Sequence, residues 1–244
     1  MNLFLTSWHR WWFTWKALER IKTVPQLGVT VWDNGSEKII QENLVGMAHS
    51  GFIQTLILNQ DNLGCRRPKV MFHQLAQADG DEFYLVTDND FLCPEGWSWI
   101  EAMLSRMRQN PRLAMLTPQY WPQWPMGPFQ ERDGVVLCKA VGNTFKLVRA
   151  AAVTQVLAKF AAHGDDYGDD GILCQLLRDN GWDVGFCTDV FCYNLELGTK
   201  DWGYLPHQLK QDPRKAGYAP PPEKYEPKDW NTLELPEELK WKPN

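Results

Sequence analysis

Two aspartates stand one residue apart where an apolar stretch of the sequence ends. The segment EFYLVTDND has the aromatic and β-branched residues typical of a strand, and Asp88 and Asp90 close it. Alternate residues of a strand point to the same side, so we expect both carboxylates to converge just past the strand end. Two like charges held together need a cation, and carboxylate oxygens suit Mg²⁺ or Mn²⁺. The pair therefore predicts a divalent-metal site, with an Asx turn and a helix cap as the alternative.

The patterns around this pair alternate between strand and helix. We expect strands over residues 2–7, 27–36, 53–60 and 82–90, and helices over residues 8–23, 37–51 and 69–78. This alternation predicts an α/β fold with a mostly parallel central sheet flanked by helices on both faces. Ligands of such sheets bind beyond the carboxyl ends of the strands. Polar residues occupy those ends at Thr6, at Asp33 and over 59–64, so we expect them to share one edge with the acidic pair.

The second half of the chain has a different character. A helix over 98–111 and a strand over 113–118 precede a Trp-, Pro- and Gly-rich loop over 119–134, and such long loops are usually functional or disordered. We expect extended chain over 135–148 and 182–197, and helices over 149–160 and 169–181. From residue 206 onward the chain holds half of its 16 prolines, which indicates an extended arm. The expected organisation is one domain over 1–205, with halves 1–118 and 119–205, and a Pro-rich C-terminal arm over 206–244.

The composition is that of an ordinary globular protein, with 244 residues, 44% of them hydrophobic, and a formal net charge of −5. This charge argues against a non-specific grip on nucleic acid, which needs basic surface. The six cysteines show no C-x-x-C or zinc-site spacing, so we expect a reducing, cytoplasmic setting. The N-terminal apolar run is too short for a signal peptide, and no run approaches the roughly 20 apolar residues of a membrane span.

Taken in order, the motifs resemble those of the GT-A glycosyltransferases, specifically the family 2-like enzymes that use nucleotide sugars. The resemblance is carried, between residues 2 and 197, by LTSWHRWWFTWKALERI, VTVWDNGS, NQDNLGCRRP, YLVTDNDFLCPEGW, VGNTFKLVRAAA and GDDGILCQLLRDNGWDVGF. It implies a GT-A, Rossmann-like fold in which YLVTDNDFLCPEGW supplies the D-x-D motif. It also implies transfer of a hexose from a nucleoside diphosphate sugar, commonly a UDP-sugar, to an acceptor hydroxyl, with Mn²⁺ or Mg²⁺ as cofactor.

The resemblance assigns roles to residues on the donor side. Asp33 is expected to contact the nucleotide base, and Asp88 to contact the ribose or the metal. An arginine fork suits phosphate because it donates hydrogen bonds in pairs. Candidates for holding the nucleotide or its phosphates are Thr6, Arg10, Asn62 and Arg67, with Arg66 as the alternative to Arg67.

The resemblance also suggests further metal ligands beside Asp88 and Asp90. Many relatives place a His shortly after the last strand, and Asn194 stands near that position here. The carbonyl oxygen of Asn194 is a weaker ligand than imidazole. His207 lies further on and is the second candidate, reaching the site from the C-terminal arm.

On the acceptor side, the segment GDDG matches the acidic pair that the family places before a helix. Its second member, Asp170, corresponds to the usual base of inverting enzymes, and Asp169 precedes it. Taken alone, this pair favours a helix N-cap and helix-dipole stabilisation over a catalytic role. Trp121 and Trp124 are the predicted acceptor platform, because aromatic faces stack on sugar rings and bases alike. Packing against the Pro-rich arm is the alternative for these two tryptophans.

Rival functions need features that the sequence lacks. A sugar nucleotidylyltransferase needs a Gly-rich loop after the first strand, and a dinucleotide-binding dehydrogenase needs G-x-G-x-x-G there; LTSWHRWW has no glycine. A metal nuclease fits poorly with the acidic net charge. Two alternatives stay open: a non-catalytic nucleotide- or glycan-binding module of the same fold, and a glycosyltransferase that acts on hydroxylated bases of modified DNA. The expected acceptors are accordingly a glycan, a lipid-linked glycan, a protein side chain or a modified DNA base.

Overall fold

The computed structural model describes residues 1–121, 130–142, 145–163 and 169–194. The strands of its sheet are β1 (Asn2–Ser7), β2 (Gly28–Asp33), β3 (Thr55–Leu58), β4 (Phe83–Asp88), β5 (Phe91–Leu92), β6 (Leu113–Trp121), β7 (Gln130–Arg132), β8 (Val135–Leu137), β9 (Lys146–Arg149) and β10 (Asp183–Asn194). The helices of the described residues are α1 (Trp11–Ile21), α2 (Lys38–His49), α3 (Arg66–Ala78), α4 (Ser98–Gln109), α5 (Ala150–Ala161) and α6 (Asp169–Asp179).

The first half of the sheet is parallel and has the strand order β3-β2-β1-β4. The chain runs from β1 outward to β2 and β3 and then returns to add β4 on the other side, so the strand order reverses between β1 and β4. In the pairing of these two strands Thr6 lies opposite Asp88, and in the β1–β2 pairing Ser7 lies opposite Asp33. Open α/β sheets bind ligands at such a reversal, beyond the carboxyl ends of the strands.

The second half of the sheet mixes directions. β9 lies antiparallel between β4 and β6, while β10 runs parallel to β6 and antiparallel to β5 and β8. The predicted α/β class with a helix-flanked central sheet is confirmed, and the structure adds that the sheet is mixed beyond β4.

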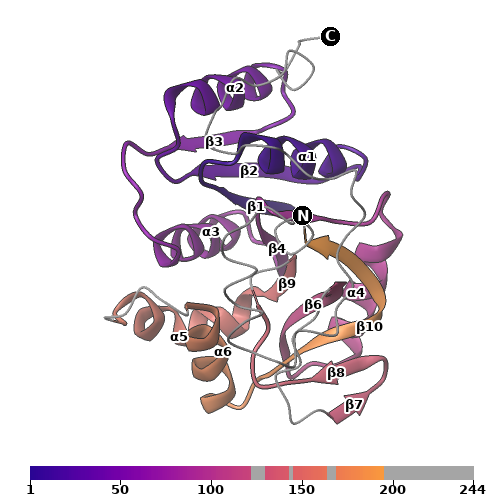
Figure 1. The fold of residues 1–244 in the computed structure, drawn as a ribbon. Helices are drawn as coiled ribbons and strands as arrows, with labels where there is room; N and C mark the ends of the chain where they lie inside the picture. The colour runs from indigo at the N-terminus through magenta and orange to yellow at the C-terminus, as the bar shows by residue number, and fades with distance from the viewer. Residues whose placement is uncertain (122–129, 143–144, 164–168, 195–244) are drawn as a thin grey trace, which may run out of the picture.

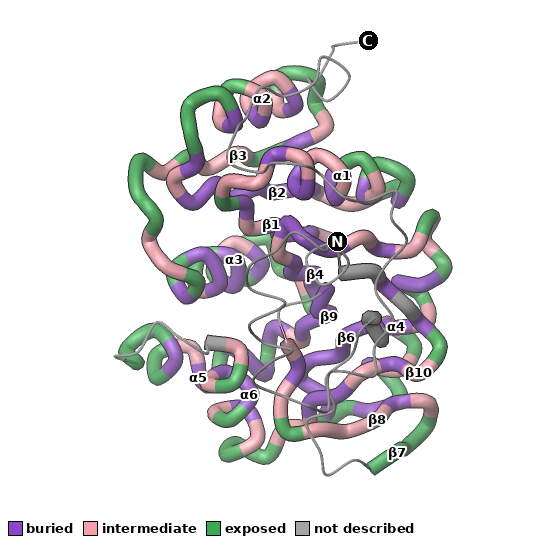
Figure 2. Tube along the Cα trace, in the orientation of Figure 1, coloured by how far each residue is buried: buried purple, intermediate pink, exposed green. Residues whose placement is uncertain are grey.

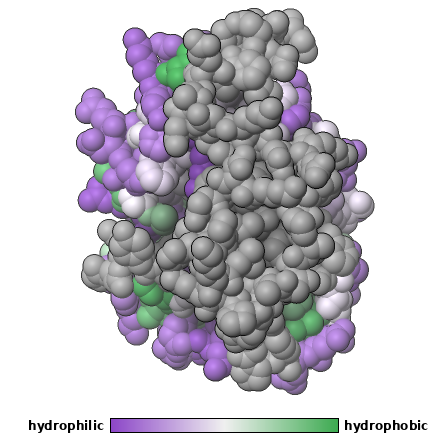
Figure 3. Space-filling model, viewed as in Figure 1, coloured by the Kyte–Doolittle hydropathy of each residue, from purple (hydrophilic) through white to green (hydrophobic). Residues whose placement is uncertain are grey.

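Helices cover both faces of the sheet (Figure 1). α1, α2 and α4 pack on one face around residues such as Leu5, Leu44 and Met103, and α3, α5 and α6 pack on the other around Phe72 and Val153. Burial is concentrated in the strands and on the inner helix faces (Figure 2). In the space-filling view the described surface is mainly hydrophilic, with small, separate hydrophobic spots (Figure 3). Within the described part of the chain, no helix combines the length and apolarity needed to cross a bilayer.

Some boundaries differ from the expectations. α1 begins at Trp11 instead of residue 8, because His9 and Arg10 have left-handed φ angles of 51° and 52°, which an α-helix does not allow. The loop expected over 119–134 contains the end of β6 and the whole of β7, because these segments pair with β10 and β8. The arm expected over 206–244 lies outside the described residues.

His73 in α3 predicts an acid sensitivity of the fold. Its ring is 0% exposed, with Nδ1 3.0 Å from the Tyr84 hydroxyl and Nε2 3.2 Å from the Thr154 hydroxyl. Burial lowers the pKa of His73 from 6.5 to about 4, because the imidazolium would lose its hydration. The folded state prefers the neutral ring, so this contribution to stability is complete above pH 6.5 and is lost as the pH falls towards 4.

Replacing His73 by Gln is therefore expected to reduce the loss of stability between these two pH values. The measurement is the free energy of unfolding in urea, compared between the wild type and the variant across that range. An equal loss in both proteins would contradict the prediction.

Candidate active site

A large cavity lies at the edge of the sheet that the strand order identifies. Its volume is about 1250 Å³, and its walls come from the ends of β1 and β4, the residues at the end of β2, the loop before α3, one face of α3 and the end of α5. Among the residues predicted from the sequence, the cavity is lined by Thr6, Arg10, Asn62, Arg67, Asp88 and Asp90. The structure thus brings together six residues that lie up to 84 positions apart in a sequence of 244.

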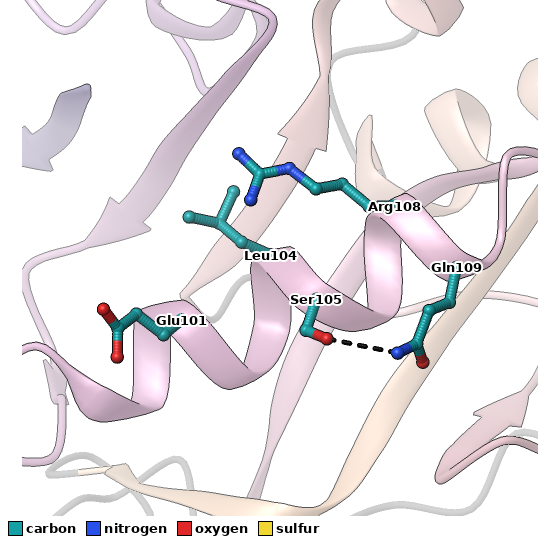
Figure 4. A pocket seen from close by; sticks show the side chains of 5 residues that line it. All are labelled: Glu101, Leu104, Ser105, Arg108 and Gln109. Atoms are coloured by element: carbon teal, nitrogen blue, oxygen red, sulfur yellow. Dashed lines mark hydrogen bonds between the residues drawn. The ribbon is translucent and has the colours of Figure 1, made fainter.

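A second, smaller cavity of about 360 Å³ lies elsewhere. All of its lining residues belong to α4, and Figure 4 shows their side chains projecting from this one helix. Ser105 and Gln109 bond each other there, with the Gln109 amide donating to the Ser105 hydroxyl at 3.3 Å. This cavity contains no strand end and no predicted site residue, so the larger cavity is the candidate active site.

Asp33 does not line the large cavity. It is 0% exposed, and its carboxylate accepts hydrogen bonds from the Ser36 hydroxyl (2.5 Å), the Ser36 backbone N–H (3.0 Å) and the Gln41 amide (2.9 Å). These bonds close the turn after β2 and join it to α2. In this structure the carboxylate predicted to contact a nucleotide base is committed to the fold instead.

Asn34, the next residue, fastens the loop before α3 to the end of β2. Its Nδ2 donates to Asn62 Oδ1 at 2.7 Å and to the Gly64 carbonyl at 3.1 Å. Its Oδ1 accepts from the Leu63 backbone N–H at 2.9 Å and from Trp32 Nε1 at 3.3 Å. Both donors and both acceptor positions of the amide are therefore used within the protein. Asn34 holds Asn62 at the cavity wall.

Gly35 makes the same docking sterically possible. A Cβ at this position would lie 2.5 Å from the backbone carbon of Asp61 and 2.8 Å from the backbone nitrogen of Asn62, and its φ is +82°. Gly51 has a similar φ of +79° but nothing within 4 Å of its virtual Cβ. Alanine at Gly51 would carry only the cost of the left-handed backbone conformation, whereas alanine at Gly35 would add the steric clash with the loop.

We expect Gly51→Ala to cost about 1–2 kcal/mol, the usual penalty of a left-handed alanine. Gly35→Ala should cost more, because the loop must also move, and it should weaken nucleotide binding. The measurements are urea unfolding and calorimetric titration with UDP and Mn²⁺. Equal destabilisation of the two variants, with unchanged binding, would show that this loop does not shape the cavity.

The loop between β1 and α1 is strained and held by its neighbours. His9 and Arg10 both have positive φ, a conformation that costs free energy for residues other than glycine. The His9 N–H donates to Ser36 Oγ at 2.8 Å, and His9 Nδ1 lies 2.6 Å from Glu37 Oε2. These contacts place Arg10 at the cavity, next to Trp8, whose side chain is 43% exposed. Strain of this kind is frequent at ligand sites.

Both members of the acidic pair lie at the cavity, Asp88 at the end of β4 and Asp90 in the turn that follows it. Asp88 ends β4 opposite Thr6, and Asp90 lines the same cavity. Asn89 lines the cavity between them, and its Nδ2 donates to Thr14 Oγ1 at 2.8 Å. The Thr6 hydroxyl is buried and has no hydrogen-bond partner among the described residues. An unsatisfied buried hydroxyl costs about 1–3 kcal/mol, so we expect a ligand atom to bond it.

Strand pairing brings Asn194 to the acidic pair. In the antiparallel pairing of β5 and β10, Asn194 lies opposite Phe91, the residue after Asp90. Within the described residues, no three His, Cys, Asp or Glu side chains cluster as a metal site. The described residues therefore offer two carboxylates here, with the backbone position of Asn194 beside them. These donors fit Mn²⁺ or Mg²⁺, which commonly take their other ligands from phosphate and water.

Asp170 lies at the start of α6, between two lysines. Its Oδ1 accepts from Lys69 Nζ of α3 at 2.9 Å and from Lys146 Nζ of β9. The side chains of Lys69, Lys146 and Asp170 are 7%, 4% and 14% exposed. Burial raises the pKa of Asp170, but the two ammonium groups and their hydrogen bonds outweigh it and hold the pKa below its usual value. The carboxylate is thus ionised and is held by two ion pairs.

The other predicted residues are placed only in part. Trp121 ends β6 opposite Tyr193 of β10, and Asp169 begins α6. Trp124 and His207 lie outside the described residues. The acceptor platform and the ligand from the C-terminal arm therefore stay predictions.

Several residues at or beside the site were not assigned a role from the sequence. Trp8 and Asn34 line the cavity, and Lys69 and Lys146 hold Asp170. A signal for Lys146 exists in TFKLV, because a lysine inside an apolar strand needs a partner when it is buried. Asn34 stands in the turn signal DNGS, but no local pattern shows which loop its amide binds.

No family model matches the sequence, and no curated protein matches it. Solved structures match its fold. A mannosyltransferase from Pyrobaculum calidifontis, PcManGT, in complex with GDP-Man and Mn²⁺, superposes with a TM-score of 0.63 at 12% identity, over 86% of this chain and 60% of that one. GalNAc-T7 with UDP, GalNAc and Mn²⁺ gives 0.61 at 9% identity, over 79% and 42%. TarS from S. aureus gives 0.57 at 12% identity, over 79% and 36%.

These structures are GT-A fold glycosyltransferases, so the protein has the GT-A glycosyltransferase fold that the sequence motifs indicate. The chain spans between 36% and 60% of the lengths of these structures. At such low identities the likeness establishes the fold alone.

Proposed function

We propose that the protein is a family 2-like, D-x-D glycosyltransferase that moves a hexose from a nucleoside diphosphate sugar, with UDP the preferred nucleotide, to an acceptor hydroxyl. The observation that carries this proposal is the cavity at the strand-order reversal, where Asp88, Asp90 and the Thr6 hydroxyl meet. Arg10 and Arg67 line the same cavity. Carboxylates suited to a metal and guanidinium groups suited to phosphate thus line one cavity.

Residues 1–118 form the donor half in this proposal. Arg10 and Arg67 bind the diphosphate through paired N–H donors. Asn62, fixed by Asn34, contacts the nucleotide. Asp33 acts on the base indirectly, through the turn that its carboxylate closes.

Asp88 and Asp90 would hold Mn²⁺ or Mg²⁺, with Asn194 as a weaker third ligand and His207 as the candidate from the arm. When bound, such an ion stabilises the negative charge that develops on the departing diphosphate. The Thr6 hydroxyl has no hydrogen-bond partner among the described residues. It would donate a hydrogen bond to an oxygen atom of the nucleotide sugar next to Asp88.

Residues 119–205 form the acceptor half. Asp170, preceded by Asp169, takes the proton from the acceptor hydroxyl, which attacks the anomeric carbon on the face opposite the diphosphate and so inverts its configuration. Trp121 and Trp124 stack on the acceptor, which is a glycan, a lipid-linked glycan, a protein side chain or a modified DNA base. The six free cysteines are consistent with a cytoplasmic reaction.

The test is release of the nucleoside diphosphate from UDP-glucose, UDP-GalNAc and GDP-mannose with Mn²⁺, with water as the first acceptor. We expect one donor to react faster with the wild type than with Asp90→Asn. A protein that binds a nucleotide sugar but never releases the diphosphate would be a binding module, and the proposed activity would be wrong.

A further inference from the structure

The two carboxylate oxygens of Asp170 differ in their hydrogen bonds. Lys69 and Lys146 both bond the same atom, Oδ1, and no hydrogen bond to Oδ2 is formed by the described residues. The two lysines come from different elements, α3 and β9, so the carboxylate is fixed from two directions. One oxygen is anchored, and the other is the atom that can receive a proton.

The position of these lysines connects Asp170 to the donor site. Lys146 lies opposite Val86 in the β4–β9 pairing, two residues before Asp88, and alternate residues of a strand share a face. Lys69 lies on α3 close to Arg67, which lines the cavity. The helix that lines the donor cavity, α3, and β9, the strand paired with β4, therefore hold Asp170.

We propose that Lys69 and Lys146 are positioning residues for Asp170, anchoring Oδ1 so that Oδ2 faces the acceptor hydroxyl; this rests on the proposed function. In the reaction the acceptor proton moves to Oδ2, and the acceptor oxygen bonds to the anomeric carbon. The bond from that carbon to the diphosphate breaks, and its electron pair leaves with the diphosphate.

The lysines also set the pH range in which Asp170 can act. The groups facing its carboxylate are Lys69 from α3, Lys146 from β9 and, along its own helix, the Cys174 thiol. The two ammonium groups lower the pKa of Asp170 against the opposing effect of burial. The carboxylate therefore stays ionised in acid, and it is a weaker base than an ordinary aspartate would be.

The test uses Lys69→Met, Lys146→Met and the charge-conserving Lys69→Arg. Loss of one ammonium should raise the pKa of Asp170 by about 1 unit or more. The acid limb of kcat/KM for diphosphate release should then move to higher pH by the same amount. Rates should fall most in acid and recover towards pH 8, because the carboxylate becomes a stronger base. Lys69→Arg should keep the wild-type profile, as should Lys16→Met, which removes a surface lysine paired with Glu19.

A second measurement does not depend on activity. ¹³C-carboxyl NMR of aspartate-labelled protein, with Asp170→Asn to identify the signal, gives the pKa of Asp170 directly. A pKa that is unchanged in both Met variants would overturn the proposal. A rate loss that is equal at every pH, or a weaker affinity for UDP in Lys69→Met, would also overturn it, by showing a purely structural or a donor-binding role.

These measurements keep the two proposals apart. If the wild type releases no diphosphate from any nucleotide sugar, the proposed function fails. The NMR titration then still decides whether the lysines control Asp170.

Discussion

Replacing Asp170 by Asn is expected to lower the rate of sugar transfer by about 100-fold or more, while nucleotide binding persists. An amide has the size of the carboxylate but cannot accept the acceptor proton. Binding persists because Asp170 does not line the donor cavity. The measurements are diphosphate release from the preferred nucleotide sugar and calorimetric titration with UDP and Mn²⁺.

The same substitution removes the counter-charge of two buried lysines, and breaking a buried ion pair costs about 3–5 kcal/mol. Binding must therefore be measured at a temperature at which the variant is folded. Asp179→Asn is the matched control, since Asp179 ends the same helix and accepts one bond, from the Gln175 amide, at the surface. Loss of both binding and transfer in folded Asp170→Asn would show that Asp170 is a structural residue.

Replacing Asp90 by Asn is expected to have the second large effect. Removing one of two carboxylates should weaken metal-dependent nucleotide binding and slow diphosphate release by about 100-fold or more, since metal stabilisation of a leaving group contributes several kcal/mol and each 1.36 kcal/mol is a factor of ten. Asp88→Asn should behave alike, because the two residues line one cavity.

The control for this pair is Asp133→Asn, a substitution in an exposed turn with a φ of 54° that Asp and Asn both tolerate. Mn²⁺ dependence of binding is read by titrating UDP with and without the ion. If Asp90→Asn keeps the wild-type Mn²⁺ dependence, the acidic pair is only a turn and a helix cap.

The first half of the fold follows closely from the sequence. The segment NLFLTS predicts a strand over 2–7, and β1 is Asn2–Ser7. Its apolar run, and the turn signals that close the next strands, are local features that a single sequence shows. The start of α1 was predicted wrongly, because His9 and Arg10 are left-handed and His9 is held there by Ser36 and Glu37, which lie 27 and 28 residues away.

The second half depends on pairings that no local pattern shows. β9 is a strand of four residues, Lys146–Arg149, and it lies antiparallel between β4 and β6. An extended run predicts a strand but not its neighbours or direction. The expectation of a mostly parallel sheet came from the strand and helix alternation of the first half, where each crossover contains a helix.

The sequence predicts those parts of the site whose position depends only on which strands end beside each other. Thr6 and Asp88 meet because β1 and β4 are neighbours, and a reversal of strand order is the expected ligand site. Asp33 also stands at a strand end, but Ser36 and Gln41 satisfy its carboxylate. Whether a polar group at a strand end bonds other protein groups or is available to a ligand depends on side-chain contacts. These contacts follow only from the tertiary structure.

The most direct test of the account is a thermal titration of the protein with UDP, UDP-glucose and GDP-mannose, with and without Mn²⁺. A ligand that binds only the folded state raises the Tm by an amount set by its concentration over Kd. We predict a rise with one nucleotide that requires Mn²⁺ and disappears in Asp90→Asn. No rise with any of these nucleotides, in the presence of Mn²⁺, would contradict the claim that this cavity binds a nucleotide sugar.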